Sequence, residues 1–506
     1  MSMSERKFLS RAFAAGTLLV LLCSPGHAAR NVRGAGGEKE KWLDLATRYP
    51  LTAPLSEDVR PAASMLARWW DALDDGLLTE LVERALRHNK DMDAALARVR
   101  EARAALGIAE AALAPSVNLA GEGRRSRRSD DAGGGGERDW YRLGFDASWE
   151  IDLFGRFRSG ASARRADLEA RVAGLQNVWV SLAAEVALNY VDYRALQARI
   201  AVAERNVLRQ EETLRLVASR RAAGLSDELA EQQARYGLES SRAGIPPLRA
   251  ALEARGNALS VLVGEVPGSL NEMLAAPAPV PCPKDACLVG IPAEALRQRP
   301  DIREAERRMV AQKARKKGAV AELAPRLRLS GSVGLESLSS GNLLSAGARG
   351  FSIGPLVLSW PLFDAGALRR NIAVQGAREE ELLAAYEKTV LDAVAEVRNA
   401  LAAYGQEHAR QRSLEEGSLA ARRALELAED RYRQGLSDFG DVLAAQGALL
   451  SMEDGLASSA GSLTAALVRL YKALGGGWAP LCEAGGNDGA DIDARLRRLS
   501  AGREGR

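Results

Sequence analysis

The residues that could take part in chemistry are few, and their spacing matches no catalytic or metal-binding pattern. The chain has three histidines and four cysteines, and no group of them has the spacing of zinc ligands. The sequence contains no GxxxxGK[ST] phosphate loop, no GxGxxG after a strand and no GxSxG turn. We therefore predict that the protein is not an enzyme and that it uses no metal or cofactor.

Charge and composition favour a helical protein over a nucleic-acid binder. In 506 residues, 69 Lys and Arg are balanced by 66 Asp and Glu, which gives a net charge of +3. A nucleic-acid-binding protein should carry a basic face, so we expect no such partner. Aromatic residues make up only 5% of the chain, and alanine, the strongest helix former, is very common. This composition suits long helices that pack closely through small side chains.

The first 28 residues have the features of a secretory signal peptide. Arg6 and Lys7 precede an apolar stretch at 12–23, which is too short to span a bilayer. Gly26 and Ala28 then supply the small residues of a cleavage site. Past residue 30 no run of 18 apolar residues occurs, so the sequence predicts no transmembrane helix. An exported chain of this kind is periplasmic, secreted or a β-barrel of an outer membrane.

The cysteines allow two modifications in an exported protein. Cys282 and Cys287 are predicted to form a disulfide in an oxidising periplasm, and two free thiols are the alternative. Cys23 could carry a lipid, but Leu22 stands where lipidation favours a small residue. Cys482 is then left without a partner or an assigned role.

The chain repeats itself with an offset of 210 to 211 residues. The tetrapeptide Gly-Leu-Ser-Asp occurs at 224–227 and again at 435–438. Other matches keep the same order, including Pro115 with Pro325 and Trp149 with Trp360, Gly155 with Gly366, and Gly264 with Gly475. We infer two copies of one unit.

The repeat and its flanking composition predict six segments. They are a signal peptide (1–28), an N-terminal periplasmic segment (29–76), repeat unit 1 (77–266), a Pro-rich linker (267–292), repeat unit 2 (293–475) and a C-terminal periplasmic tail (476–506).

Each unit is expected to begin with a helix and to continue with two strands. Apolar residues recur every seven residues from Leu78 to Leu113, with a second set three residues later, as in coiled coils. Pro115 ends this helix, and after it the apolar period changes to two, most clearly over 141–153. Loops rich in Gly and Ser, at 126–138 and 338–348, separate the two strands of each unit, so the chain has four strands.

A very long helix and a return helix complete each unit. The stretch from about 163 to 223 lacks proline, which predicts roughly 90 Å of helix. The Gly-Leu-Ser-Asp turn then lets glycine adopt a positive φ and Ser or Asp cap the return helix. This return helix is expected to be interrupted at Pro246-Pro247 and to end at Gly264. Unit 2 repeats the plan, with its long helix at about 367–434.

Four strands with an apolar face cannot close a membrane barrel alone, because the smallest such barrels have about eight strands. Three copies would supply about twelve strands and leave no unpaired edge. The predicted fold is therefore mainly α with a small β part, built from two tandem repeats of long coiled-coil helices plus β-hairpins. Three copies would form a twelve-stranded outer-membrane barrel continuous with a periplasmic helical barrel.

Five short motifs span most of the chain in a fixed order. They are Trp-Trp at 69–70, Trp-Glu-Ile-Asp-Leu-Phe-Gly at 149–155, Arg-Pro-Asp-Ile-Arg at 299–303, Pro-Leu-Phe-Asp-Ala-Gly at 361–366 and Tyr-Lys-Ala-Leu-Gly-Gly-Gly-Trp at 471–478. Together they resemble the TolC-like outer-membrane efflux channels, in particular the NodT-like outer-membrane factors. The resemblance implies a homotrimer in bacterial outer-membrane lipid with a large periplasmic portion. It also implies a passive exit duct for small molecules such as drugs, docked to a periplasmic adaptor (membrane-fusion) protein and an inner-membrane pump.

The resemblance also implies a site at the second Gly-Leu-Ser-Asp turn, where aspartates of the family ring the closed pore. Asp438 belongs either to this channel constriction or to a helix N-cap, since Asp227 occupies the same place in unit 1. Asp441 has Ala230 as its counterpart and lies too deep to be a cap, so it is the main candidate for the ring. Such rings concentrate negative potential in a narrow mouth.

Two neighbouring positions refine this expectation. The family often carries a second Asp three residues further on, but here that residue is Ala444, which leaves a single ring from this segment. Tyr432 matches a position that helps to hold the tip shut, and ordinary packing between helices is its alternative role.

A periplasmic coiled-coil adaptor or scaffold protein of an export system is the alternative function. An adaptor has one helical hairpin flanked by β-rich halves. This chain instead has two hairpin-bearing units, and its strands of period two end in aromatic residues.

Overall fold

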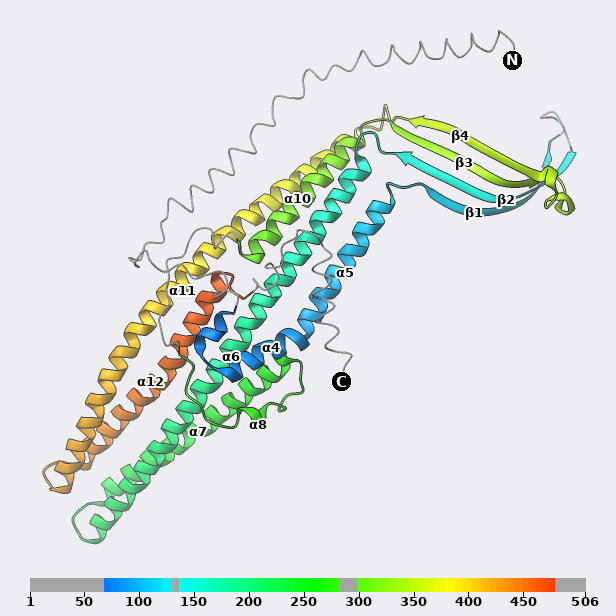
Figure 1. The fold of residues 1–506 in the computed structure, drawn as a ribbon. Helices are drawn as coiled ribbons and strands as arrows, with labels where there is room; N and C mark the ends of the chain where they lie inside the picture. Colours follow the sequence, from blue (N-terminus) through cyan, green and yellow to red (C-terminus); the bar gives the residue numbers. More distant parts are fainter. Residues whose placement is uncertain (1–67, 130, 132–135, 283–297, 478–506) are drawn as a thin grey trace, which may run out of the picture. The chain divides into compact units, whose positions relative to one another are not determined.

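The computed structural model describes residues 68–129, 131, 136–282 and 298–477 (Figure 1). Unit 1 comprises α4 (Gly76–His88), α5 (Lys90–Ala111), β1 (Ser116–Arg128), β2 (Gly136–Ile151), α6 (Arg156–Ala222) and α7 (Glu228–Val263), with η1 (Trp69–Leu73) before it and the short α8 (Asn271–Leu274) after it. Unit 2 comprises α10 (Pro300–Ala321), β3 (Arg326–Ser337), the 3-10 turns η3 (Ser340–Asn342) and η4 (Ala346–Ala348), β4 (Arg349–Ser359), α11 (Ala367–Arg433) and α12 (Phe439–Ala473).

From α5 and α10 onward the two units repeat the same order of helices and strands, which confirms the tandem-repeat fold. The long helices α6 and α11 each contain 67 residues, about 100 Å of helix, and their corresponding ends are 211 residues apart. Both begin after a glycine with positive φ, Gly155 at 81° and Gly366 at 83°, a conformation that glycine adopts without strain. Pro115 and Pro325 both lie between a helix and a strand, as predicted.

The first helix of unit 1 is not the continuous coil that the heptad spacing predicted. It breaks at Asn89, which has extended geometry (φ −63°, ψ 139°) between α4 and α5. The Asn89 side-chain oxygen accepts hydrogen bonds from the backbone N–H groups of Asp91 (2.8 Å) and Met92 (3.3 Å). Because asparagine offers the backbone this local alternative, it ends one helix and starts the next.

The residue before α5 and the residue before α10 also hold the end of a return helix. Asn89 donates from Nδ2 to the carbonyl oxygen of Leu262 (3.0 Å), near the end of α7. Arg299, 210 residues later, donates from Nη1 to the carbonyl oxygen of Ala473 (2.6 Å), the last residue of α12. Helix-end carbonyls lack intrahelical partners, so each bond satisfies an acceptor and closes its unit.

Arg299 retains its charge although it is buried, with 8% of its surface exposed. Burial opposes the charged form, but hydrogen bonds to Asp301 (2.7 Å) and Glu396 (2.8 Å) raise the pKa of Arg299 above its ordinary value.

The return helix of unit 1 was expected to break at Pro246-Pro247, and this expectation is wrong. α7 continues through both prolines from Glu228 to Val263. The two prolines are exposed, so water can solvate the carbonyl groups that lose their helical partners, while α7 remains packed along α6.

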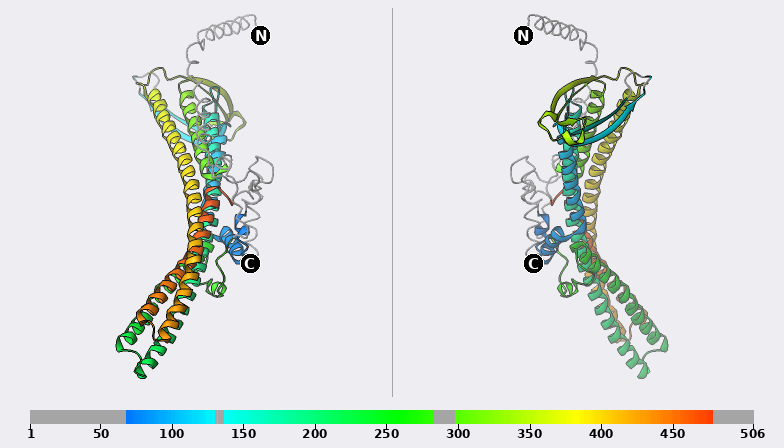
Figure 2. Two further views of the ribbon diagram at one scale, coloured as in Figure 1. Left: turned by 90° about the vertical axis from the view of Figure 1, so that its left-hand side faces the viewer. Right: turned by 90° about the vertical axis from the view of Figure 1, so that its right-hand side faces the viewer.

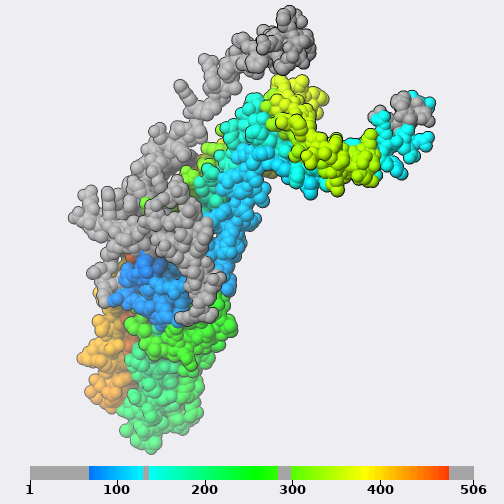
Figure 3. Space-filling model, turned by 45° about the vertical axis from the view of Figure 1, so that its right-hand side comes forward, coloured from blue at the N-terminus to red at the C-terminus, as the bar shows by residue number. Residues whose placement is uncertain are grey.

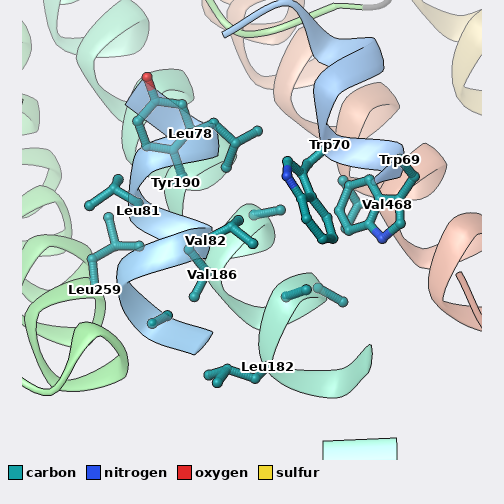
Figure 4. Close-up of a cluster of buried hydrophobic side chains, with 14 of the residues drawn as sticks. Trp69, Trp70, Leu78, Leu81, Val82, Leu182, Val186, Tyr190, Leu259 and Val468 are labelled. Carbon is teal, nitrogen blue, oxygen red and sulfur yellow. The ribbon is translucent and has the colours of Figure 1, made fainter. Parts of the chain in front are cut away.

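One hydrophobic core lies where η1, α4, α6, α7 and α12 meet (Figure 4). Its largest fully buried side chains include Trp69, Leu78 and Leu259. Trp69 stacks on Tyr471 with ring centroids 5.4 Å apart, so the first and last recognition motifs meet in the fold.

A buried hydrogen-bond network borders this core. The Tyr190 hydroxyl donates to Asp75 (2.8 Å) and accepts from Arg194 Nε (3.0 Å). Burial is the main cause that raises the pKa of Tyr190 to about 12, and the hydroxyl therefore remains a donor near neutral pH.

The four strands form one antiparallel sheet in the order β1-β2-β3-β4. β1 and β2 pair from Ser116↔Ser148 to Arg128↔Gly136, so strands occupy much of the 126–138 segment that was expected to be a loop. Arg125 and Asp139 face each other across the two strands at 2.6 Å, and this charge pair supports the extension.

The sheet has one apolar face and one polar face, because side chains alternate along a strand. The polar face carries ion pairs of Arg142 with Asp146 and Glu336. No helix packs extensively on either face within the described chain, and the sheet extends beyond the helices (Figures 1 and 3). The apolar face is formed by Val117, Leu119, Leu143, Phe145, Trp149, Leu329, Val333, Leu335, Phe351, Ile353, Leu356 and Leu358.

A glycine pair bends the sheet toward its polar face. Gly144 of β2 pairs with Gly334 of β3. A Cβ atom on Gly144 would lie 2.7 Å from the carbonyl oxygen of Val333, and one on Gly334 would lie 2.6 Å from that of Leu143. Only glycine permits such close approach of two backbones. Gly350, which pairs with Gly334 from β4, has open space around it.

We predict that Gly144→Ala destabilises the sheet, because its methyl group would meet backbone atoms that cannot rotate away. The expected cost is about 1–3 kcal/mol in free energy of unfolding. Thermal unfolding of the protein in detergent should show a lower midpoint for Gly144→Ala than for the matched control Gly350→Ala. Equal midpoints would show that the sheet is not bent at this pair.

Candidate functional site at the turns of the two helical hairpins

The turns of the two helical hairpins, α6–α7 and α11–α12, lie side by side at the end of the molecule far from the sheet (Figures 1 and 2). Each turn has a glycine with positive φ, Gly224 at 73° and Gly435 at 74°. The turns are joined directly, because Arg220 of α6 donates from Nη1 to the carbonyl oxygen of Arg433 in α11 (3.0 Å). We call this region the hairpin tip.

Tyr432 is the central side chain of the hairpin tip. It is buried, and its hydroxyl lies 3.3 Å from the hydroxyl of Ser226 in the other turn. Its ring packs edge-on against Phe439 with centroids 5.6 Å apart, and the guanidinium carbon of Arg220 lies 4.8 Å from its centroid. Tyr432 therefore connects the two repeats, while its role in keeping a pore shut stays a prediction.

Sequence reasoning did not identify Arg220, Ser226 or Phe439 as parts of this site. Ser226 belongs to the repeated tetrapeptide, so the repeat was a signal that it lies at a turn. Its contact with Tyr432 joins residues 206 positions apart, and no local pattern could show that pairing.

Ion pairs farther from the turns also tie α12 to the first repeat. Glu453 is 9% exposed and accepts hydrogen bonds from Arg209 of α6 (3.3 Å) and Arg422 of α11 (2.9 Å). The next residue, Asp454, binds both Arg199 Nε (2.8 Å) and Nη2 (3.0 Å). Hydrogen bonding to Asp454 is the main cause that raises the pKa of Arg199, so this pair stays charged.

Asp438 and Asp441 are both exposed at the start of α12. Asp438 occupies the N-cap position, but its carboxylate makes no capping hydrogen bond. By contrast, the Asp227 carboxylate accepts a hydrogen bond from the backbone N–H of Ala230 (2.9 Å). Asp438 therefore stands at the N-cap position, as predicted, but its side chain does not act as a cap. Water can solvate this exposed carboxylate instead. Asp441 lies in the first helical turn, where a negative charge is favourable near the helix dipole.

The different contacts of the two aspartates predict different effects of substitution. Asp227→Ala should weaken the start of α7 by about 1 kcal/mol, the typical value of an N-cap. We expect amide hydrogen exchange at Ala230 to become about fivefold faster in Asp227→Ala. Asp438→Ala, the matched control, should leave exchange at Asp441 nearly unchanged. Equal acceleration in both variants would mean that the Asp438 carboxylate also caps its helix.

Several predicted sites lie wholly or partly outside the described residues. Cys282 is exposed, but Cys287, Cys23 and Cys482 are not described, so the disulfide and the lipidation remain predictions. Within the described ranges, no group of three His, Cys, Asp or Glu side chains is placed to hold a metal ion. The helices among these residues include none that is both long and apolar enough to cross a membrane.

Comparison with known proteins decides between the two candidate functions. The profile of the family described as "Outer membrane efflux protein" matches residues 81–265 and again residues 291–476. The chain belongs to this family. The two matches are offset by 210 residues at their starts and 211 at their ends, in agreement with the repeat.

The sequence similarity between this efflux protein and its relatives covers most of its length. The solvent efflux pump outer membrane protein SrpC of Pseudomonas putida is 32% identical over 430 residues, which cover 83% of this chain and 90% of SrpC. Nodulation protein T of Rhizobium leguminosarum bv. trifolii is 30% identical over 426 residues, 82% of this chain and 89% of the relative. The solved structure of the outer-membrane channel OprN shares 35% identity and a TM-score of 0.80 over 86% of this chain and 96% of that one.

These similarities establish a TolC-like outer-membrane efflux channel, mostly helical with a small antiparallel sheet. The protein is located in the outer membrane. The alternative of a periplasmic adaptor or scaffold is therefore set aside. The family, SrpC and OprN are described as efflux or channel proteins rather than enzymes.

Proposed function

We propose that three copies of the efflux channel form a continuous passive duct for small molecules, such as drugs, and that the duct does no chemistry on its cargo. The observation that carries this proposal is the open sheet. β1 and β4 are its outermost strands, and neither has a second strand partner within the described chain. Three sheets joined edge to edge would give a closed barrel of about twelve strands with its apolar face toward lipid.

The helices would then form the periplasmic part of the duct. α6 and α11 are each about 100 Å long, and a trimer would place six hairpins around one axis. The hairpin tip lies at the end far from the sheet, where a periplasmic adaptor protein and an inner-membrane pump could dock. The name of SrpC describes that relative as the outer membrane protein of an efflux pump, which supports such partners here.

The trimer can be tested by measuring the mass of the detergent-extracted protein. We expect native mass spectrometry of outer-membrane extracts to give three chains per particle. A particle of one chain would overturn the barrel, because four strands would remain open at both edges.

Asp441 is proposed to form the negative ring of the closed tip. Its side chain is exposed, and no ion pair joins it to another side chain in the described part of one chain. A threefold axis would bring three Asp441 carboxylates toward each other, with Ala230 at the equivalent place in the other hairpin. Oxygen ligands of this kind bind multivalent cations.

We predict that Asp441→Ala abolishes the block of conductance by divalent or trivalent cations added on the periplasmic side. The measurement is single-channel recording in a planar bilayer, with Asp227→Ala as a control that changes a turn without removing the ring. Asp438→Ala tests whether the second exposed carboxylate contributes to the block. If both Asp441→Ala and Asp438→Ala keep full block, the constriction lies elsewhere in the channel.

A further inference from the structure

We propose that two short junction segments, Leu153-Phe154 and Leu362-Phe363, insert into the inner leaflet of the outer membrane and that nearby arginines bind the phosphates of its phospholipids. The inference rests on the proposed barrel, because the barrel defines which face of the sheet meets lipid. Each segment lies between a strand and the long helix that follows it, and both lie at the same end of the sheet (Figure 1).

The junction segments expose large apolar side chains in both repeats. Leu153 and Phe154 are 57% and 53% exposed, and Leu362 and Phe363 are 80% and 91% exposed. Neighbouring exposed apolar residues of this kind mark a surface that another molecule covers. They continue the apolar face of the sheet, which runs past Trp149 to Ile151 at the end of β2 in one repeat and is followed by Trp360 in the other.

The two tryptophans fix these segments to the preceding helices. Trp149 donates from Nε1 to the carbonyl oxygen of Leu113 (3.0 Å), just after α5. Trp360 donates in the same way to Leu323 (3.0 Å), just after α10. The two bonds are equivalent in the repeats, so each indole joins a strand end to a helix end while its ring stays partly exposed.

The length of the apolar band along β2 is consistent with Trp149 at a membrane boundary. Tyr141 and Trp149 are separated by about 27 Å of strand. A strand tilted by about 40° would cross about 21 Å of membrane, close to the apolar band of about 25 Å in such barrels. Tryptophan is enriched at this boundary in membrane proteins, so the junction segments just beyond it meet the lipid interface.

Exposed arginines follow each junction segment in the first turn of the long helix. Arg369 and Arg370 of α11 are exposed. Arg158 of α6 is also exposed, although it already binds Asp152 (3.3 Å). Guanidinium groups recognise phosphate through paired hydrogen bonds. An apolar pair next to arginine therefore fits a phospholipid, with acyl chain and phosphate on adjacent surfaces.

A second copy of the chain is the competing occupant, and the sheet order separates the two cases. Phe363 follows β4, an edge strand that meets a neighbouring copy in the proposed trimer. Phe154 follows β2, an interior strand with β1 and β3 on either side, so it is the position least accessible to a neighbouring copy.

The test uses a photoreactive benzoylphenylalanine at Phe154 or Phe363 of the full-length trimer in nanodiscs of phosphatidylethanolamine and phosphatidylglycerol. After irradiation we expect both variants to gain the mass of one phospholipid per labelled chain. The matched control is Tyr236 of α7, an aromatic residue that is 74% exposed and far from the sheet, and it should gain none. Covalent dimers without lipid adducts, or no adduct at either position, would overturn the proposal.

A further position separates failure of this inference from failure of the barrel. Phe145 lies in the middle of the apolar face and should give a lipid adduct whenever the barrel is formed. A lipid adduct at Phe145 with none at Phe154 and Phe363 overturns the junction proposal alone. The absence of an adduct at Phe145 overturns the proposed barrel itself.

Replacing both Arg369 and Arg370 with glutamine tests the phosphate contact. In nanodiscs that contain both lipids, the adduct at Phe363 should shift from phosphatidylglycerol toward phosphatidylethanolamine, because attraction to anionic lipid is lost. An unchanged lipid ratio would overturn the role of these arginines.

Discussion

Backbone N–H and C=O groups along the outer edges of β1 and β4 have no second strand partner within the described chain, and hydrocarbon offers none. The rest of the architecture depends on this constraint. In the proposed trimer other copies complete the sheet, and the bend at Gly144 and Gly334 would turn the polar face inward, toward a lumen. Once the sheet is closed, each long helix must leave the membrane at a fixed place on the circumference, so the strands determine where the helical wall stands.

The helical wall is held together differently from the sheet. Apolar residues, including Leu425, Val442 and Leu449, form a cluster that begins at Tyr432 and Phe439 in the hairpin tip. Polar contacts across the repeats then fix its alignment. Exposed ion pairs contribute little to stability, but Glu453 is buried between two arginines, and loss of both would leave its negative charge unbalanced. At the turns themselves the contacts are the hydrogen bond from Arg220 to the carbonyl oxygen of Arg433 (3.0 Å) and the approach of the Tyr432 and Ser226 hydroxyl groups to 3.3 Å.

Much of the fold could be predicted from the sequence because its signals are periodic and occur twice. Pro115 and Pro325, the Gly-Leu-Ser-Asp turns and the change of apolar period together indicated the order of helices and strands. The errors arose where a local feature was outweighed or overlooked. Asn89 interrupts the predicted continuous helix because its side chain caps α5. In contrast, α7 continues through Pro246-Pro247 while it packs along α6. Arg125 and Asp139 extended strands into a glycine-rich segment.

The candidate site was less predictable than the fold. Tyr432, Asp438 and Asp441 were identified from a family resemblance, which indicates positions and not contacts. Two partners of Tyr432, Ser226 and Arg220, come from the other repeat, and the missing cap of Asp438 depends on how one side chain is solvated. Neither property leaves a pattern in the sequence.

Asn89 and Arg299 occupy equivalent positions, and each donates a hydrogen bond to a carbonyl at the end of a return helix, from an amide in one repeat and a guanidinium in the other. Ala230 and Asp441 also occupy equivalent positions with different side chains. In a trimer, two similar units per chain would give the wall an approximate sixfold rotational symmetry, while its charges would obey only threefold symmetry. A ring of six identical partner subunits would therefore meet alternating kinds of hairpin. Each partner subunit would have to tolerate both, or the two sets of three would bind with unequal strength.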